Sequence, residues 1–356
     1  MDSVRNNLNI SELEKLCMSC GIPGFEEEPR EVFIELAKQF ADEIKVDVMG
    51  NCYAFINPGG SPKIMFDAHL DEVGFIIKYI DENGLVYASS VGRIDSEAAS
   101  AQAVTVHGYA GNIPGCVSTR CVHLLSPEEL SRSAGLSSLW IDIGASSRPE
   151  AEKYVLPGDW ITWKSNFSEL GGSKIYSKSL DNRASVFVLI ELLRELKGYA
   201  EAEICCVASV QEELGFRGAA ITSAHASPDV AIVLDTCYTT DIPGTNKKIM
   251  GEVAQGLGPV IVRGPNIDKN VGAALIKAAQ GNDIPYQVQA SAIATGTDAN
   301  CIQISGKGVA VGLMAIPLRY MHSPVEVVSL QDLANTVRCL KAFVLQSSGA
   351  FRNRNY

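Results

Sequence analysis

Within the stretch Ile64–Ile80, IMFDAHLDEVGFIIKYI, the pattern of apolar and turn residues along the chain changes. Its first six residues form a short apolar run, as expected of a strand that is covered on both faces. Short β-type runs then follow one another, separated by turn sequences such as DENG, GNIPG and LPGD. This pattern predicts a small all-β unit, residues 73–163, inserted into a domain made of residues 1–72 and 164–356.

The segments outside the insertion alternate between helix-type and strand-type patterns. Residues 183–196 (RASVFVLIELLREL) have the wide apolar face of a helix, and the pattern also predicts a helical segment over 11–42. Residues 204–210 (ICCVASV) and 230–234 (VAIVL) are continuous apolar runs, which favour buried strands. The alternation predicts an α/β domain whose mostly parallel sheet is flanked by helices.

The composition excludes several classes of function. The net charge of −11 argues against a nucleic-acid partner, because phosphate binding needs clustered Lys and Arg. No apolar run approaches the ~20 residues of a membrane span, and the N-terminus does not have the pattern of a signal peptide. Ten cysteines without an export signal predict reduced thiols and a cytoplasmic location. P-loop, nucleophile-elbow and H-E-x-x-H motifs are absent from the sequence.

Polar side chains follow the apolar runs, where strands are expected to end. They are His69 and Asp71 after IMFDA, Glu212 and Glu213 after ICCVASVQ, Asp235 at the end of VAIVLD, His322 eight residues beyond VAVGLM, and Asp181 just before the helix over 182–196. In an open α/β sheet, binding sites form beyond the carboxyl ends of the strands. Histidine and carboxylate ligands without cysteine suit Zn²⁺, Co²⁺ or Mn²⁺. The pattern therefore predicts a metal site.

Each of these residues also has an ordinary structural explanation. Asp181 alone could be a helix N-cap, and Asp235 could end a strand before a turn. Adjacent glutamates such as Glu212 and Glu213 are usually a solvated face. Their shared position at strand ends or a helix start, within one domain, favours the metal site over separate explanations.

The same residues lie in stretches that resemble the M42 family of metallo-aminopeptidases, which includes glutamyl aminopeptidases and the tetrahedral TET peptidases. The matching stretches are AHLDEVGF (68–75), SLDNRAS (179–185), VQEELGFRGA (210–219), VLDT (233–236), TGTDA (295–299) and RYMHSPVE (319–326). The inserted β unit is similar to the dimerisation domain of that family, a small barrel of PDZ-like type. The resemblance implies a homo-oligomer built from dimers, up to a homododecamer.

The resemblance also implies a role for each site residue. Five residues would hold two divalent ions, Zn²⁺ first with Co²⁺ or Mn²⁺ as alternatives: Asp181 bridges both, His69 and Asp235 complete one, and Glu213 and His322 complete the other. Glu212 would be the general base, and Asp71 would orient His69. The implied reaction is the removal of N-terminal residues from peptides.

Two alternatives stay open at this point. One is another metallohydrolase on the same scaffold, such as a deacylase or a glycosidase, and the other is an inactive assembly protein. The sequence also departs from the family pattern at Arg93-Ile94-Asp95, where members often carry Trp-Asp. This departure leaves the preferred N-terminal residue of the substrate open.

Overall fold

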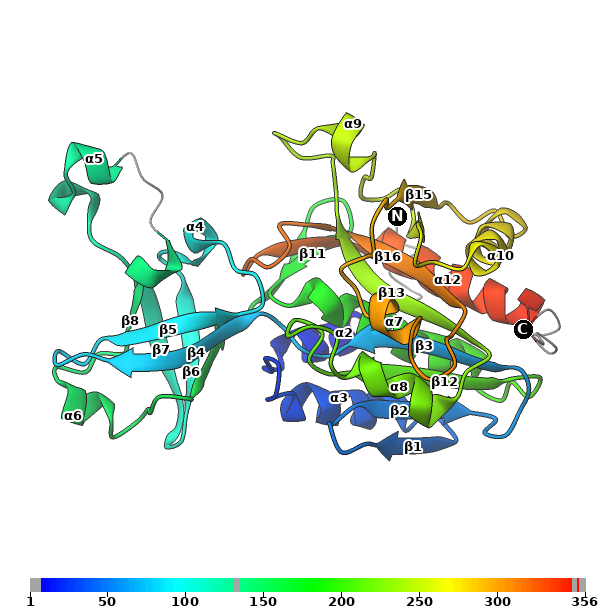
Figure 1. Ribbon diagram of the computed structural model, residues 1–356, viewed down its shortest axis with the longest axis horizontal. Coiled ribbons are helices and arrows are strands. Elements are labelled where there is room, and N and C mark those ends of the chain that lie inside the picture. Colours follow the sequence, from blue (N-terminus) through cyan, green and yellow to red (C-terminus); the bar gives the residue numbers. More distant parts are fainter. Residues whose placement is uncertain (1–7, 131–134, 348–350, 352–356) are drawn as a thin grey trace.

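The computed structural model describes residues 8–130, 135–347 and 351. Figure 1 shows a small barrel at one end of the molecule and a larger body of sheet and helices at the other. The chain enters the barrel after β3 and returns to the larger body after β9. The prediction of an α/β fold with an inserted barrel is confirmed.

The large sheet has eleven strands, and its centre is parallel. In spatial order the main path is β1 (Glu43–Val46), β2 (Cys52–Ile56), β12 (Glu203–Ser209), β3 (Lys63–His69), β13 (Val230–Tyr238), β16 (Val311–Arg319), β17 (Glu326–Ser329), β11 (Lys174–Ser177) and β10 (Phe167–Leu170), while β14 (Val260–Arg263) pairs with β16 and with β15 (Gln287–Ala290). The strands β12, β3, β13 and β16 run parallel, and the flanking pairs along the main path are antiparallel. The mostly parallel sheet of the prediction thus corresponds to these four central strands.

Helices cover both faces of the sheet, and the central strands bury side chains toward each. The larger body contains α2 (Ile10–Met18), α3 (Glu27–Ala37), α7 (Leu180–Leu196), α8 (Ala219–Ala226), α9 (Lys247–Met250), α10 (Lys269–Gln280), α11 (Ala299–Ile302) and α12 (Leu330–Ser347), while the short helices α4 (Ser96–Ala99), α5 (Pro127–Leu130) and α6 (Arg148–Ala151) belong to the inserted unit. Helix α7 contacts α2, α3 and α12, and α8 contacts α11. Ile64 and Phe66 of β3 belong to the core beneath α7, whereas Met65 between them belongs to the core on the other face.

The barrel closes on itself and has a core of its own. Its strands are β4 (Gly74–Ile80), β5 (Val86–Val91), β6 (Ala103–Gly108), β7 (Gly111–Ser118), β8 (Trp140–Asp142) and β9 (Trp160–Trp163), paired in the order β4-β5-β8-β7-β6-β9. Phe75 and Trp163 meet edge to face inside it, with ring centroids 5.3 Å apart. Closure leaves no edge strand, which explains how so short a unit holds its shape.

The helical segment predicted over residues 11–42 is wrong in its middle. The structure divides it into α2 and α3, joined by the segment 19–26. The sequence GIPG (21–24) explains the break, because proline lacks an amide hydrogen and Gly24 adopts a φ of +89°. The joining segment contacts the barrel, where Phe25 stacks on Trp160 with centroids 5.3 Å apart.

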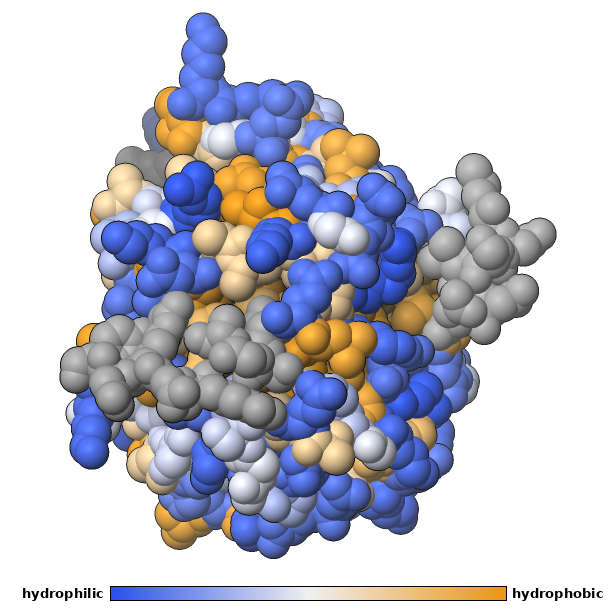
Figure 2. Space-filling view, turned by 90° about the vertical axis from the view of Figure 1, so that its right-hand side faces the viewer, coloured by the Kyte–Doolittle hydropathy of each residue, from blue (hydrophilic) through white to orange (hydrophobic). Residues whose placement is uncertain are grey.

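The described residues contain no helix that is both long and apolar enough to cross a bilayer. Figure 2 shows the face on the right-hand side of Figure 1, where hydrophilic residues surround small, separate groups of hydrophobic ones. All ten cysteines are free thiols in the structure.

Candidate metal centre

The fold brings the five predicted ligands together at one edge of the sheet. His69 is the last residue of β3, and Asp235 lies in the second half of β13. Asp181 stands at the start of α7, Glu213 in the loop after β12, and His322 in the loop after β16. Their donor atoms form two overlapping groups, each within 4.8 Å, and Asp181 belongs to both.

Parallel pairing explains why residues so distant in sequence meet here. His69 of β3 lies in register with Ser209, the last residue of β12, so the loop that carries Glu212 and Glu213 begins beside it. Asp235 is on β13, which pairs in parallel with β3 on the other side. Since the carboxyl ends of parallel strands point to one edge, the loops that follow them surround a common space. This space is a cavity of about 450 Å³.

His69 and His322 present the same nitrogen to the carboxylates. Nδ1 of His69 lies 3.1 Å from the carbonyl oxygen of Asp71, and Nδ1 of His322 lies 2.7 Å from the carbonyl oxygen of Arg93. A carbonyl only accepts hydrogen bonds, so each Nδ1 carries the hydrogen and each Nε2 faces the carboxylates. Nε2 of His69 is 3.4 Å from Oδ1 of Asp181, and Nε2 of His322 is 3.3 Å from Oδ2 of Asp181.

This arrangement calls for cations between the two histidines and Asp181. A neutral Nε2 and a carboxylate oxygen are both acceptors, so they attract each other only when a proton or a metal ion lies between them. Oδ1 of Asp181 is buried and accepts no hydrogen bond. Both histidines have their Nδ1 fixed by an oxygen, as is usual for metal-ligating histidines. The donor set therefore fits one divalent ion in each group, with Asp181 shared.

The pKa values express the same excess of negative charge. Burial opposes protonation of both rings, but the attraction of the neighbouring carboxylates prevails and raises the pKa of His69 well above its usual range and that of His322 to about 11. The two histidines hold the pKa of Asp181 far below its usual value despite its burial. Burial raises the pKa of Asp235 well above its normal value. Metal ions would take the place of the protons that this cluster attracts.

Asp71 contacts the site in two ways. Its carboxylate accepts hydrogen bonds from the backbone N–H groups of Glu212, at 3.0 Å, and of Glu213, at 2.9 Å. The same carboxylate lies 3.5 Å from Nδ1 of His69, farther than the carbonyl oxygen of Asp71 itself. The Asp71 main chain is thus the nearer partner of His69, and the side chain mainly holds the loop of the two glutamates.

Glu212 lines the cavity and is largely buried. Burial, together with the nearby Asp235 and Asp298, raises the pKa of its carboxyl group to about 10, although His69 lowers it. At neutral pH a carboxyl group with this pKa keeps its proton and cannot act as a base. Divalent cations in the site would lower this pKa again through their positive charge.

Glu326 is a site residue that sequence reasoning missed. Its buried carboxylate accepts the backbone N–H of Asp181 at 2.8 Å and the backbone N–H of His322 at 2.6 Å. It thereby joins the loop that carries His322 to the start of α7, which carries Asp181. The signal was present in RYMHSPVE, where Glu326 follows His322 by four residues, but spacing alone does not show which backbone groups a side chain meets.

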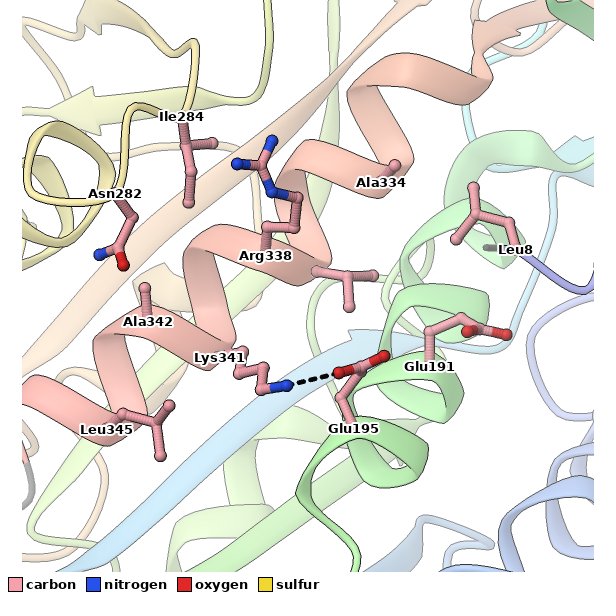
Figure 3. A pocket seen from close by; sticks show the side chains of 11 residues that line it. Leu8, Glu191, Glu195, Asn282, Ile284, Ala334, Arg338, Lys341, Ala342 and Leu345 are labelled. Carbon is pink, nitrogen blue, oxygen red and sulfur yellow. Dashed lines mark hydrogen bonds and ion pairs between the residues drawn. The ribbon is translucent and has the colours of Figure 1, made fainter. Parts of the chain in front are cut away.

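Another hollow in the described part of the molecule has a different character. It measures about 620 Å³ and lies between α7 and α12, where Lys341 and Glu195 form an ion pair at 2.6 Å (Figure 3). Of the two metal-type groups found among the described residues, neither lies there. The cavity at the strand ends is therefore the candidate functional site.

The chain is similar to known proteins both in sequence and in fold. The family model described as M42 glutamyl aminopeptidase matches residues 50–339. A lysyl aminopeptidase of Pyrococcus furiosus is 36% identical over 335 residues, covering 93% of this chain and 95% of the relative. The TET aminopeptidase of Thaumarchaeota archaeon SCGC AB-539-E09 is 31% identical with a TM-score of 0.91, covering 96% and 98%. The Pyrococcus horikoshii TET1 peptidase, which assembles into a tetrahedron or a large octahedral shell, is 32% identical with a TM-score of 0.84, covering 94% and 98%.

Proposed function

Because this chain belongs to the M42 glutamyl aminopeptidase family and is an aminopeptidase, we propose that it works with two divalent metal ions and uses Glu212 as general base. The observation that carries the proposal is the geometry around Asp181, whose two carboxylate oxygens each face an Nε2 atom, one of His69 and one of His322. Zn²⁺ suits this donor set, with Co²⁺ or Mn²⁺ as alternatives.

The residues of the chain divide the work in the proposed reaction. Bound cations would polarise the scissile carbonyl and acidify a water, as in other two-metal hydrolases. Glu212 takes the proton of the attacking water and returns it to the leaving amine. Asp71 holds the backbone of Glu212 in place through the hydrogen bond at 3.0 Å. Peptide substrate would occupy the 450 Å³ cavity beside these residues.

The test of this proposal compares a short peptide with its N-acetylated twin, with cleavage followed by mass spectrometry. Stepwise shortening of the free peptide alone is expected, because acetylation removes the amine lone pair and adds bulk where the substrate ends. A deacylase would prefer the acetylated peptide, a glycosidase would cleave neither, and an inactive assembly protein would be silent with all substrates. Equal cleavage of both twins would overturn the aminopeptidase mechanism.

We further propose that residues 73–163 are a dimerisation domain of a cytoplasmic homo-oligomer. The net charge and the composition argue against nucleic-acid and membrane partners. The large assemblies of the Pyrococcus horikoshii relative support the oligomer. Exposed apolar side chains on the barrel, among them Tyr109 and Leu124, offer contact surface. Replacing residues 73–163 by a short Gly-rich link should leave a smaller particle in light scattering, and an unchanged large particle would contradict the role.

The cavity also favours a class of substrate. Arg93 is the one charged side chain lining it that is neither a predicted ligand nor the predicted base. It forms no ion pair with any described residue, so its charge is available to a substrate. We propose that Arg93 favours an acidic N-terminal residue, which agrees with the glutamyl description of the family and contrasts with the lysyl relative.

Chromogenic Glu, Leu and Lys substrates test this preference. Arg93→Ala should lower kcat/KM for the Glu substrate by roughly 10- to 100-fold, the value of a charge-assisted contact, and leave the Leu substrate nearly unchanged. Arg93→Glu should shift the preference toward Lys. Lys153→Ala removes the same charge from an exposed position on the barrel and serves as the control. Equal losses for all three substrates would contradict a role in selection.

A further inference from the structure

The loop that carries Glu212 is held by side chains from three distant segments. Four successive backbone N–H groups donate to side-chain oxygens: Val210 to Asn51 at 3.0 Å, Gln211 to Glu26 at 3.1 Å, and Glu212 and Glu213 to Asp71 at 3.0 and 2.9 Å. Regular secondary structure would satisfy these groups with carbonyl oxygens. Here the orientation of the loop depends on the three side chains.

Gln211 is the position in this loop that needs support most. Its φ is +58°, in the left-handed region that residues other than glycine rarely adopt. Such a conformation persists only where the surroundings fix it. Because Gln211 directly precedes Glu212, its backbone sets the direction in which the Glu212 side chain leaves the loop.

Glu26 supplies the contact that holds Gln211. Its side chain is almost fully buried, and Oε1 also accepts the N–H of Gly24 at 2.9 Å. No cation among the described residues pairs with it. Burying a carboxylate without a cation is costly, and burial accordingly raises the pKa of Glu26 to about 7. The hydrogen bonds that Glu26 accepts from the N–H groups of Gly24 and Gln211 offset part of this cost.

The backbone on either side of Glu26 is itself fixed. Phe25 stacks on Trp160 of the barrel, and α3 begins at Glu27. The carboxylate therefore projects from a short segment anchored at both ends, which gives it a defined place beside the loop after β12. Glu26 is not among the residues that line the cavity, so it would reach the site only through the loop backbone.

We propose that Glu26 is a positioning residue for catalysis, holding the backbone of Gln211 so that the Glu212 carboxylate points at the attacking water. The proposal rests on the assignment of Glu212 as general base. It predicts an effect on the chemical step rather than on substrate or metal binding, because Glu26 reaches the site only through the loop backbone.

Three variants of the full-length protein test the proposal. Glu26→Ala should lower kcat by about 10- to 100-fold, the range that misplacement of a reacting group by about 1 Å costs, while KM and metal content stay near wild type. Glu26→Gln should recover most of kcat, because its amide oxygen still accepts the N–H of Gln211. Glu27→Ala, at the exposed neighbouring position, is the matched control and should behave as wild type.

Several results would overturn the proposal. They are wild-type kcat in Glu26→Ala, equal loss in the Ala and Gln variants, or metal loss that parallels the loss of activity. If Glu26→Ala does not fold, Glu26→Asp keeps the charge and withdraws the acceptor by one methylene, and unchanged kcat there would refute the role. Failure of the proposed function is recognised separately, because the wild-type protein would then cleave no free peptide or Glu212→Gln would be fully active.

Discussion

The carboxyl edge of the central sheet and the inserted barrel each bury a histidine, and the two surroundings are opposite. At the sheet edge, His69 faces the carboxylates of Asp181 and Asp235, and its pKa is raised well above the usual range. In the barrel, His107 stacks on Trp160 with ring centroids 3.6 Å apart, and burial lowers its pKa to about 4. The surroundings of His69 favour a positive charge, whereas those of His107 oppose one.

The comparison separates a site from a structural core. Both ring nitrogens of His107 have neutral partners, Oδ1 of Asn112 and Oγ1 of Thr162, each at 3.0 Å. His107 therefore has a hydrogen-bond partner for each ring nitrogen without needing an ion. The sheet edge keeps an unbalanced cluster of carboxylates in a buried place, which is costly unless cations bind there. Function is expected where the folded chain leaves a charge for something else to balance.

The strongest way to break this comparison is to remove the shared carboxylate. Asp181→Asn should abolish binding of both metal ions and lower activity by more than the roughly 10²–10⁴-fold expected from loss of a general base, because the residue belongs to both groups. Metal analysis of the purified variant, together with its kinetics, measures the effect. Full occupancy of one ion would contradict the bridging role.

Loss of the base should separate chemistry from metal binding at the same edge. Glu212→Gln keeps the shape of the side chain and leaves every predicted ligand in place, so both ions should stay bound. Turnover should fall by roughly 10²–10⁴-fold, since proton transfer from the attacking water is lost. Near-normal turnover with intact metal content would show that another group acts as the base.

The smallest predicted effect concerns the barrel and its dependence on pH. The pKa of His107 is about 4 in the folded protein, below its usual value of 6.5. As the pH falls, His107 therefore takes up a proton in the unfolded chain at a higher pH than in the folded protein. Stability contributed by neutral His107 is complete above about pH 6.5 and is lost as the pH falls toward 4, by at most about 3 kcal/mol.

His107→Gln removes this titration while keeping a polar side chain, so it isolates the contribution of one group. Denaturant unfolding of wild type and variant, compared at pH 7.5 and pH 4.5, measures the difference in the free energy of unfolding. The wild type should lose more stability on acidification than the variant, and activity at neutral pH should be the same in both. An equal loss in the two proteins would show that His107 does not carry a depressed pKa.

Much of the fold followed from pattern because the pattern has a direct physical cause. Continuous apolar runs such as 204–210 and 230–234 became strands covered on both faces, since only such strands bury every side chain. The segment 11–42 was misread, because helix-type spacing continues across GIPG although its glycines and proline end the helix. The interruption matters, since it produces the segment that carries Glu26.

The sequence by itself determined the fold class, the presence of an inserted β unit and a set of candidate metal ligands that includes His69, Asp181 and His322. It could do so because apolar periodicity and residue type are local properties. Only the tertiary structure decided that Asp181 faces both histidines, that Glu326 joins two of the site's backbones, and that Glu26 holds Gln211. Apart from the contact of Glu326 with His322, which is four residues away, these contacts link residues more than a hundred positions apart. Hydrogen-bond partners at such separation depend on strand register and loop direction, which the whole fold sets and no short pattern records.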